Sequence, residues 1–125
     1  MDESRIHTAG KRGEDLAVSY LERHQCEILA RNWHSRFGEI EIIAQNAVHL
    51  IFLEVKTRTF GAQVPPLEAV TAQKQRRIVK TAMLYLQSHP TARQPRFDVL
   101  GIELAPDGWT LRRYTYLKNA FFAEI

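Results

Sequence analysis

Two stretches of this chain repeat apolar residues every three or four positions, which is the spacing of an amphipathic helix. The first stretch covers residues 8–24 and is apolar at Ala9, Gly13, Leu16, Ala17, Tyr20 and Leu21. The second covers 71–88, where Thr71 is suited to cap a helix and His89-Pro90 to end it. The sequence therefore predicts two helices separated by a long segment of a different kind.

The remaining apolar residues alternate with polar ones or form short runs, and both patterns indicate β-strands. Strands at 39–45 and 48–58 flank Asn46-Ala47 and predict a hairpin. We expect further strands at 27–33, 96–104 and 109–117, with a loop over 59–66. The predicted order is α-β-β-β-α-β-β, an α/β or α+β domain with a mixed sheet flanked by helices.

The composition is that of a small globular protein, with 25% charged and 45% hydrophobic residues. We expect one domain over residues 1–125, in which 1–7 and 118–125 form flexible tails. We find no run long enough to span a membrane, and we expect no signal peptide at the start. Cys26 is the only cysteine, so an intrachain disulfide is excluded and a cytoplasmic location without a membrane partner is expected. The net charge of +3 permits a polyanionic partner but does not require one.

The predicted strand 48–58 carries a carboxylate and an amine after its apolar run. The run is apolar on both faces, which is typical of a central strand. Side chains two residues apart share a face, so Glu54 and Lys56 point to the same side. Partly buried charges are costly there unless they pair or bind a metal ion. Two interpretations follow: an ion pair at a strand end, or a metal site for phosphodiester chemistry.

The neighbouring predicted strand supplies a second carboxylate, if the hairpin has the right register. A loop with an even number of residues at 46–47 pairs Glu41 with Phe52. Glu41 then lies diagonal to Glu54 on the same face, with Cβ atoms about 7 Å apart or less. A three-residue loop would send Glu41 to the opposite face. The turn therefore decides whether both carboxylates can hold one cation.

A third acid lies on the first predicted helix. With about 100° of rotation per residue, most polar side chains of this helix gather on one arc, but Glu14 lies beside Gly10 and Val18 on the shoulder of the apolar face. A carboxylate in that position faces the sheet. It either pairs with a nearby arginine or reaches the same cation, directly or through a water.

These residue types together suit a divalent cation. Mg²⁺ prefers oxygen ligands in octahedral geometry and keeps several waters, so two or three carboxylates leave room for water and a phosphate oxygen. The ion can lower the pKa of a bound water, which a lysine such as Lys56 can orient. We therefore expect Mg²⁺ or Mn²⁺ as cofactor, with Glu41, Glu54 and the backbone carbonyl of Val55 as candidate ligands.

The second predicted helix carries its basic residues opposite its apolar stripe. Such a row can follow the phosphates of a nucleic acid, or it can be an ordinary solvated helix face. The candidate nucleic-acid-binding residues are Gln73, Lys74, Arg77, Lys80 and, close to the acids, Arg58. Gln73 and Lys74 are the helix residues closest to the acid site in the sequence, so an approach of their side chains to that site is a second expectation.

Aromatic residues offer a weaker signal for nucleic-acid binding. Trp33, Trp109 and the pair Phe121-Phe122 are expected in the core or in dimer contacts rather than as platforms for stacked bases. Asp98, on the predicted strand 96–104, is expected to have a structural role.

Several of these segments together resemble the bacterial YraN-like family, over about residues 10–117. The segments that carry the resemblance are Gly13-Glu14, Arg31-Asn32, 38–44 (GEIEIIA), 52–58 (FLEVKTR) and 96–99 (RFDV). That family is similar to Holliday-junction resolvases and other members of the restriction-endonuclease-like superfamily, which share the PD-(D/E)xK site. The resemblance implies a restriction-endonuclease-like fold.

The resemblance also implies roles for four residues. Glu54 and Lys56 match the (D/E)xK pair, Glu14 matches the helix glutamate of resolvase-like members, and Glu41 stands where the superfamily usually has aspartate. The extra methylene of Glu41 is expected to weaken or alter metal binding. The implied function is metal-dependent cleavage of branched or structured DNA, with a homodimer by analogy with resolvases. The alternative is a nucleic-acid-binding protein that keeps the nuclease fold without turnover.

Overall fold

The strands of this protein form one mixed sheet with helices on both faces. The computed structural model describes residues 3–60 and 66–122. Its elements are α1 (Glu3–Arg23), β1 (Glu27–Ser35), β2 (Gly38–Gln45), β3 (His49–Thr59), α2 (Pro66–Ala69), α3 (Ala72–Ser88), β4 (Gln94–Leu104) and β5 (Leu111–Phe121). The strand order is β1-β2-β3-β4-β5, and only β3 and β4 run parallel. The predicted α+β class and the order of the main elements are confirmed, and the one-turn helix α2 was not predicted.

Both ends of the fold are longer than the hydrophobic pattern predicted. Residues 3–7 belong to α1 and 118–121 to β5, while 1–2 and 123–125 of the predicted tails lie outside the described residues. Strand β5 continues past Leu117 through an irregularity at Asn119, whose φ of 51° lies in the left-handed region. Phe121 then pairs with Phe97, and their rings stack with centroids 5.2 Å apart. The break in alternation at 118–119 hid this last pairing from sequence reasoning.

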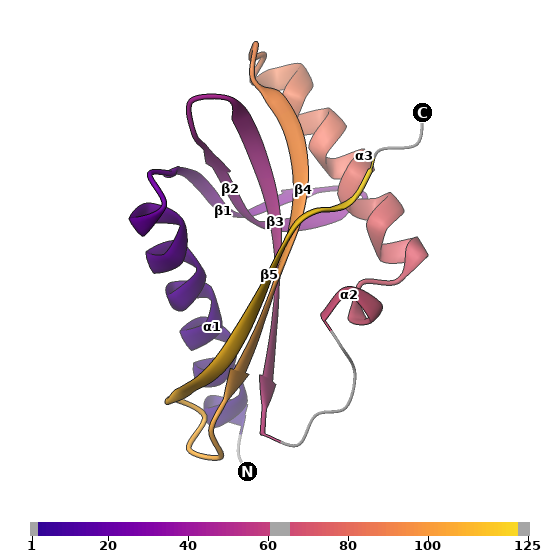
Figure 1. Cartoon of the computed structure of the whole chain (residues 1–125). Coiled ribbons are helices and arrows are strands. Elements are labelled where there is room, and N and C mark those ends of the chain that lie inside the picture. The colour runs from indigo at the N-terminus through magenta and orange to yellow at the C-terminus, as the bar shows by residue number, and fades with distance from the viewer. Residues whose placement is uncertain (1–2, 61–65, 123–125) are drawn as a thin grey trace.

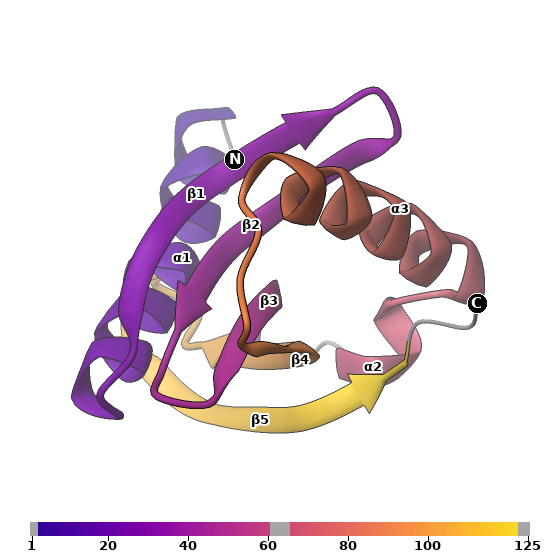
Figure 2. The same ribbon diagram turned by 90° about the horizontal axis from the view of Figure 1, so that it is seen from above.

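Figure 1 shows α1 on one face of the sheet and α3 on the other. Seen from above, the sheet curls around α3, and α1 lies outside the curve (Figure 2). Strand β3 is the middle strand, and its residues from Leu50 to Val55 are all buried, as predicted for a central strand. Of the helices within 3–60 and 66–122, none is long and apolar enough to cross a membrane.

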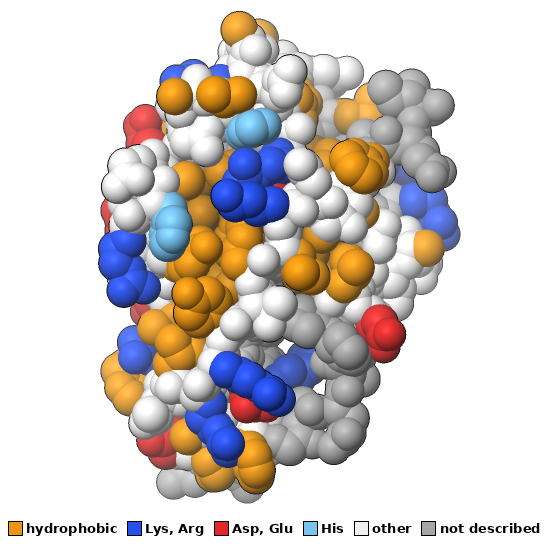
Figure 3. Space-filling model, in the orientation of Figure 1, with side chains coloured by type: hydrophobic (Ala, Val, Ile, Leu, Met, Phe, Trp, Pro, Cys, Tyr) orange, Lys and Arg blue, Asp and Glu red, His pale blue; other side chains and the backbone are white. Residues whose placement is uncertain are grey.

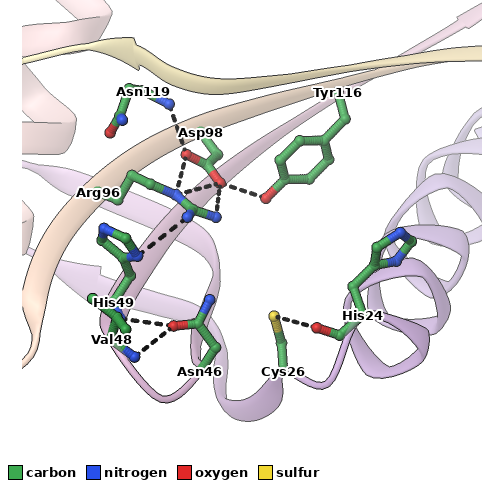
Figure 4. Close-up of polar contacts among 9 residues, drawn as sticks. All are labelled: His24, Cys26, Asn46, Val48, His49, Arg96, Asp98, Tyr116 and Asn119. Atoms are coloured by element: carbon green, nitrogen blue, oxygen red, sulfur yellow. Dashed lines mark hydrogen bonds and ion pairs between the residues drawn. The ribbon is translucent and has the colours of Figure 1, made fainter.

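A buried polar network joins β4 to β5 (Figure 4). The carboxylate of Asp98 is fully buried and accepts hydrogen bonds from the guanidinium of Arg96 at 2.9–3.1 Å. It also accepts from the Tyr116 hydroxyl at 2.5 Å and from the backbone N–H of Asn119 at 3.0 Å. Burial and the charge of Asp98 raise the pKa of the Tyr116 hydroxyl. Because the carboxylate is saturated with donors, Asp98 holds the irregular end of β5 in place rather than presenting itself to a ligand.

The aromatic residues divide between the core and the surface. Trp33 packs against the core on the α3 face, as predicted, and Phe121 is buried. Phe122 and Trp109 are exposed, at 74% and 55%, so of the two expected positions the core is ruled out for them and a dimer contact stays a prediction. Trp109 lies after the β4–β5 turn, where the Arg12 guanidinium sits 4.1 Å from the ring centroid.

One face of the molecule carries an aromatic cluster between α1 and β5. In the view of Figure 3, hydrophobic side chains gather along this side, with Lys and Arg side chains around them. Tyr20 of α1 stacks on Tyr116 with centroids 4.8 Å apart and meets Tyr114 edge-on at 5.6 Å. These contacts hold α1 against the edge strand β5. Another side of the helix faces β1 and β2.

Candidate functional site

The site lies where strands β2 and β3 separate. The two strands pair from Ile42↔Leu53 to Gln45↔Leu50, and the Asn46 N–H to His49 O bond closes the turn, which leaves 47–48 as its central residues. The predicted pairing of Glu41 with Phe52 is therefore wrong by two residues, because the turn is centred one residue later than expected, on 47–48 rather than 46–47. One further step of the observed register places Glu41 opposite Glu54. Since both turns have an even length, the prediction that these side chains share a face survives.

We call the point where β2 and β3 separate the fork. Here the Glu41 side chain takes the place of a backbone carbonyl as hydrogen-bond acceptor. Its Oε2 accepts the backbone N–H of Val55 at 3.2 Å, beyond the last β2–β3 pair. Burial is the main cause that raises the pKa of Glu41 to about 8, and the charge of Glu54 adds to it. The Val55 N–H and the charge of Lys74 lower it only in part. A carboxyl group with such a raised pKa either keeps its proton or is stabilised in its ionised form by a nearby cation.

Glu54 is 4% exposed and is shared by two lysines. Lys74 Nζ lies 2.7 Å from Glu54 Oε1, and Lys56 Nζ lies 3.6 Å from the same oxygen. Burial, together with the neighbouring Lys74, lowers the pKa of Lys56. Burial also works against the charge of Lys74, but its bond to Glu54 raises the pKa of that lysine. Lys74 therefore lies at the acid site, as its closeness to the site in the sequence suggested, although the helical projection grouped it with the outer basic residues.

Glu14 reaches the site from α1 and is held by β1. Its Oε1 accepts a hydrogen bond from Asn32 Nδ2 at 3.0 Å, and Arg31 lies 3.6 Å away. Asn32 has a φ of 52°, a conformation that asparagine tolerates better than most residues. The neighbours of Asn32 pair with those of Glu41, so these two residues stand opposite each other. Asn32 was not predicted as a site residue, although the Arg31-Asn32 pair was part of the family resemblance.

A glycine sets how closely α1 approaches the end of β3. A Cβ atom added at Gly13 would overlap Oγ1 of Thr57. Gly13 is buried at this crossing, and Glu14 is the next residue along the helix. The lack of a side chain at Gly13 is therefore what brings Glu14 next to the fork.

An open pocket of about 280 Å³ lies between these elements. Its lining residues are Gly10, Glu14, Asn32, Glu39, Glu41, Val55, Lys56, Thr57 and Arg58. The structure thus gathers Glu14, Glu41 and Lys56 around one pocket, as the sequence predicted, and adds Asn32. Glu54 does not line it; it lies buried beside it, against Lys74.

The donor set suits a hard divalent cation held by few protein ligands. Mg²⁺ is commonly bound by one or two carboxylates and keeps waters in its other positions. Glu41 and Glu54 offer two carboxylates, and Val55 between Glu54 and Lys56 contributes a carbonyl. In the parts of the chain that the structure describes, no three Asp, Glu, His or Cys side chains are grouped closely enough to hold a metal ion. Among the described residues, a bound ion would therefore have two carboxylates at most, and Glu14 does not complete a group of three acids.

The other predicted DNA contacts lie on exposed surfaces. Arg77 and Lys80 are exposed on α3, and Gln73 is exposed in the first turn of that helix. Lys80 Nζ lies 5.3 Å from the ring centroid of Phe37, at the tip of the β1–β2 hairpin. Arg58 is exposed at the pocket. Arg58 thus lies at the pocket, and Lys80 lies near the tip of the β1–β2 hairpin.

The family described as "Uncharacterised protein family UPF0102" matches residues 13–102. The chain belongs to this family. UPF0102 proteins of similar length include one of Geobacter metallireducens, 43% identical over 113 residues, which are 90% of each chain. One of Caldanaerobacter subterraneus is 40% identical, over 91% of this chain and 94% of its own. One of Porphyromonas gingivalis is 38% identical, over 90% and 82%.

The match confirms the resemblance to the YraN-like family. The matched segment begins at Gly13 and ends at Ile102 in β4, so it contains every predicted catalytic residue. The description of UPF0102 names no activity, and the function must be argued from the geometry of the site.

Proposed function

We propose that this UPF0102 protein is a divalent-metal-dependent endonuclease that acts on branched or otherwise structured DNA. The observation that carries the proposal is the fork between β2 and β3. There Glu41 and Glu54 share a face, Lys56 follows on the same face, and an open pocket adjoins them. Glu54 is close enough to raise the pKa of Glu41. Two carboxylates at such a distance attract a cation strongly.

The residues would divide the chemistry as follows. Glu41, Glu54 and the Val55 carbonyl bind Mg²⁺ or Mn²⁺, which supplies an activated water and stabilises charge on the phosphate. Lys56 orients the attacking water from the strand next to the carboxylates. Glu14, fixed by its bond to Asn32, holds waters around the site.

Substrate binding would rest on the exposed cations. Arg58 at the pocket, Gln73 at the start of α3, and Arg77 and Lys80 along it are all exposed, and we expect them to contact DNA phosphates. Branched DNA is the substrate that the resemblance to resolvases implies. Such enzymes act as homodimers, so we expect a second copy of this chain to make the second cut.

The test is an assay on defined DNA. A four-way junction, a single strand and a linear duplex are incubated with the protein in Mg²⁺ or Mn²⁺. We expect cleavage of the junction, reduced by about a hundredfold or more in Glu54→Gln and in Lys56→Gln, the usual effect of removing a group that acts on the transition state. Glu22→Gln is the matched control, because Glu22 is exposed on α1. Cleavage that survives both site substitutions would refute the proposed site.

A second candidate is a nucleic-acid-binding protein that keeps this fold without turnover. Two observations favour it. The amine of Lys74 forms an ion pair with Glu54. The described residues contain no group of three acids that could hold a metal ion. It predicts junction binding without cleavage under either metal ion. Binding through phosphates would weaken with salt, and Lys80→Gln would reduce the slope of log K against log salt by about one.

A further inference from the structure

Lys74 stands in an unfavourable position within its own helix. Helix α3 begins with Thr71 as N-cap, whose side chain accepts the backbone N–H of Lys74 at 3.2 Å. The first turn of a helix carries a partial positive charge, which favours acids and disfavours lysine. This first turn contains no acidic residue. The charge of Lys74 must therefore be offset from outside the helix.

Glu54, on the central strand β3, provides that offset. Lys74 Nζ lies 2.7 Å from Glu54 Oε1, within the range of a charge-assisted hydrogen bond, whereas Lys56 Nζ lies 3.6 Å from the same atom. The Glu54 side chain is 4% exposed and that of Lys74 is 37% exposed. A buried carboxylate thus takes its main counter-charge from a lysine that can still reach solvent.

A lysine in this place competes with a metal ion for the same carboxylate. We infer that Lys74 is a tethered counter-cation of Glu54, which a divalent ion must displace in order to bind. This inference rests on the proposed function, because it assumes that Glu54 is a metal ligand. Lys74 is then a positioning residue: it holds the Glu54 carboxylate in place at 2.7 Å, and its displaced amine becomes available to a DNA phosphate beside the pocket.

The test measures binding of Mn²⁺ alone to the full-length protein, by titration calorimetry without DNA. Lys74→Gln removes the competing charge, so its Kd for Mn²⁺ should fall about tenfold or more, as expected when a charge-assisted hydrogen bond need not be broken. Arg76→Gln is the matched control: it removes one positive charge from an exposed residue of the same helix. Its Kd should change by less than about twofold, since solvent screens exposed charges. Lys74→Met, which keeps the aliphatic stem, serves as a second variant.

A thermal measurement gives an independent readout. Without metal, Lys74→Gln should melt below wild type, because Glu54 loses its nearer partner. Adding Mn²⁺ should raise the Tm of this variant more than that of wild type.

The outcomes separate the inference from the proposed function. If all proteins bind Mn²⁺ with the same Kd, or Lys74→Gln binds more weakly, the inference is wrong and the metal site stands. If no protein binds Mn²⁺, both are wrong, and Glu54–Lys74 is a structural ion pair.

Discussion

Replacing Glu41 by glutamine should make this protein more stable at alkaline pH. The substitution Glu41→Gln keeps an oxygen that can accept the Val55 N–H but removes the charge. In wild type, burial and the nearby Glu54 raise the pKa of Glu41 from an ordinary 4.5 to about 8 in the folded state. The folded protein therefore binds a proton at this site more tightly than the unfolded chain does.

The sign and size of the effect follow from this difference. A raised carboxyl pKa contributes stability below pH 4.5, and that contribution is lost as the pH rises to about 8. A rise from 4.5 to about 8 corresponds to a loss of about 5 kcal/mol, at about 1.4 kcal/mol per pKa unit. Movement of the Lys74 amine toward an ionised Glu41 would recover part of it. We expect a loss of about 2–5 kcal/mol, which is large against a total stability of about 5–15 kcal/mol.

Urea unfolding of both proteins at pH 5 and pH 8.5, in the presence of a chelator, measures this quantity. The relevant number is the change in the free energy of unfolding of wild type between the two pH values, minus the same change for Glu41→Gln. Histidines and other acids titrate in both proteins and cancel. If the two proteins lose equal stability between pH 5 and pH 8.5, Glu41 is not a strained carboxyl group, and the electrostatic account of the fork is wrong.

Four further substitutions test the support of the site at Gly13 and of the buried network between β4 and β5. Gly13→Ala places a methyl group on Thr57 and should lower the free energy of unfolding by about 1–3 kcal/mol despite a better helix propensity, and adding Thr57→Ala should restore most of it in a double-mutant cycle. Asp98→Asn leaves the buried Arg96 without its counter-charge and should cost about 3–5 kcal/mol in urea unfolding. Tyr116→Phe removes only the hydroxyl donor and should cost about 1–2 kcal/mol, so a loss equal to that of Asp98→Asn would contradict this ranking.

The hydrophobic pattern predicted which face of the sheet Glu41 and Glu54 occupy. It did not predict which β3 residue lies opposite Glu41. Alternation along a strand fixes the faces for any turn of even length, so Glu41 and Glu54 were placed together correctly. The register itself depends on the position of the turn, and 46–49 contains no Gly or Pro to mark it. The shift of the turn by one residue moved Glu41 from a diagonal position to one opposite Glu54.

Lys74 shows why a helical projection misplaces long side chains. The projection gives the direction of the Cα–Cβ bond, and for Lys74 that direction lies outside the apolar stripe. A lysine side chain can bend along an apolar surface and carry its amine several ångströms from that direction. The closeness of Lys74 to the site in the sequence suggested that it could approach, and the packing of α3 on the sheet identifies the buried carboxylate of Glu54 as its partner. Asn32 was missed for a related reason, since its partner Glu14 comes from another element.

The fork also explains how position 41 can hold a glutamate where the resemblance to the restriction-endonuclease-like superfamily implies an aspartate. After Leu53, β2 no longer pairs with β3, and the N–H of Val55 needs another acceptor. An aspartate at this position would be shorter by one carbon–carbon bond, about 1.5 Å, and would leave that N–H unsatisfied at a cost of about 1–3 kcal/mol. Glu41 spans the gap with Oε2, and its second oxygen can still face a cation. The longer side chain thus lets one carboxylate close the strand fork and serve the proposed metal site.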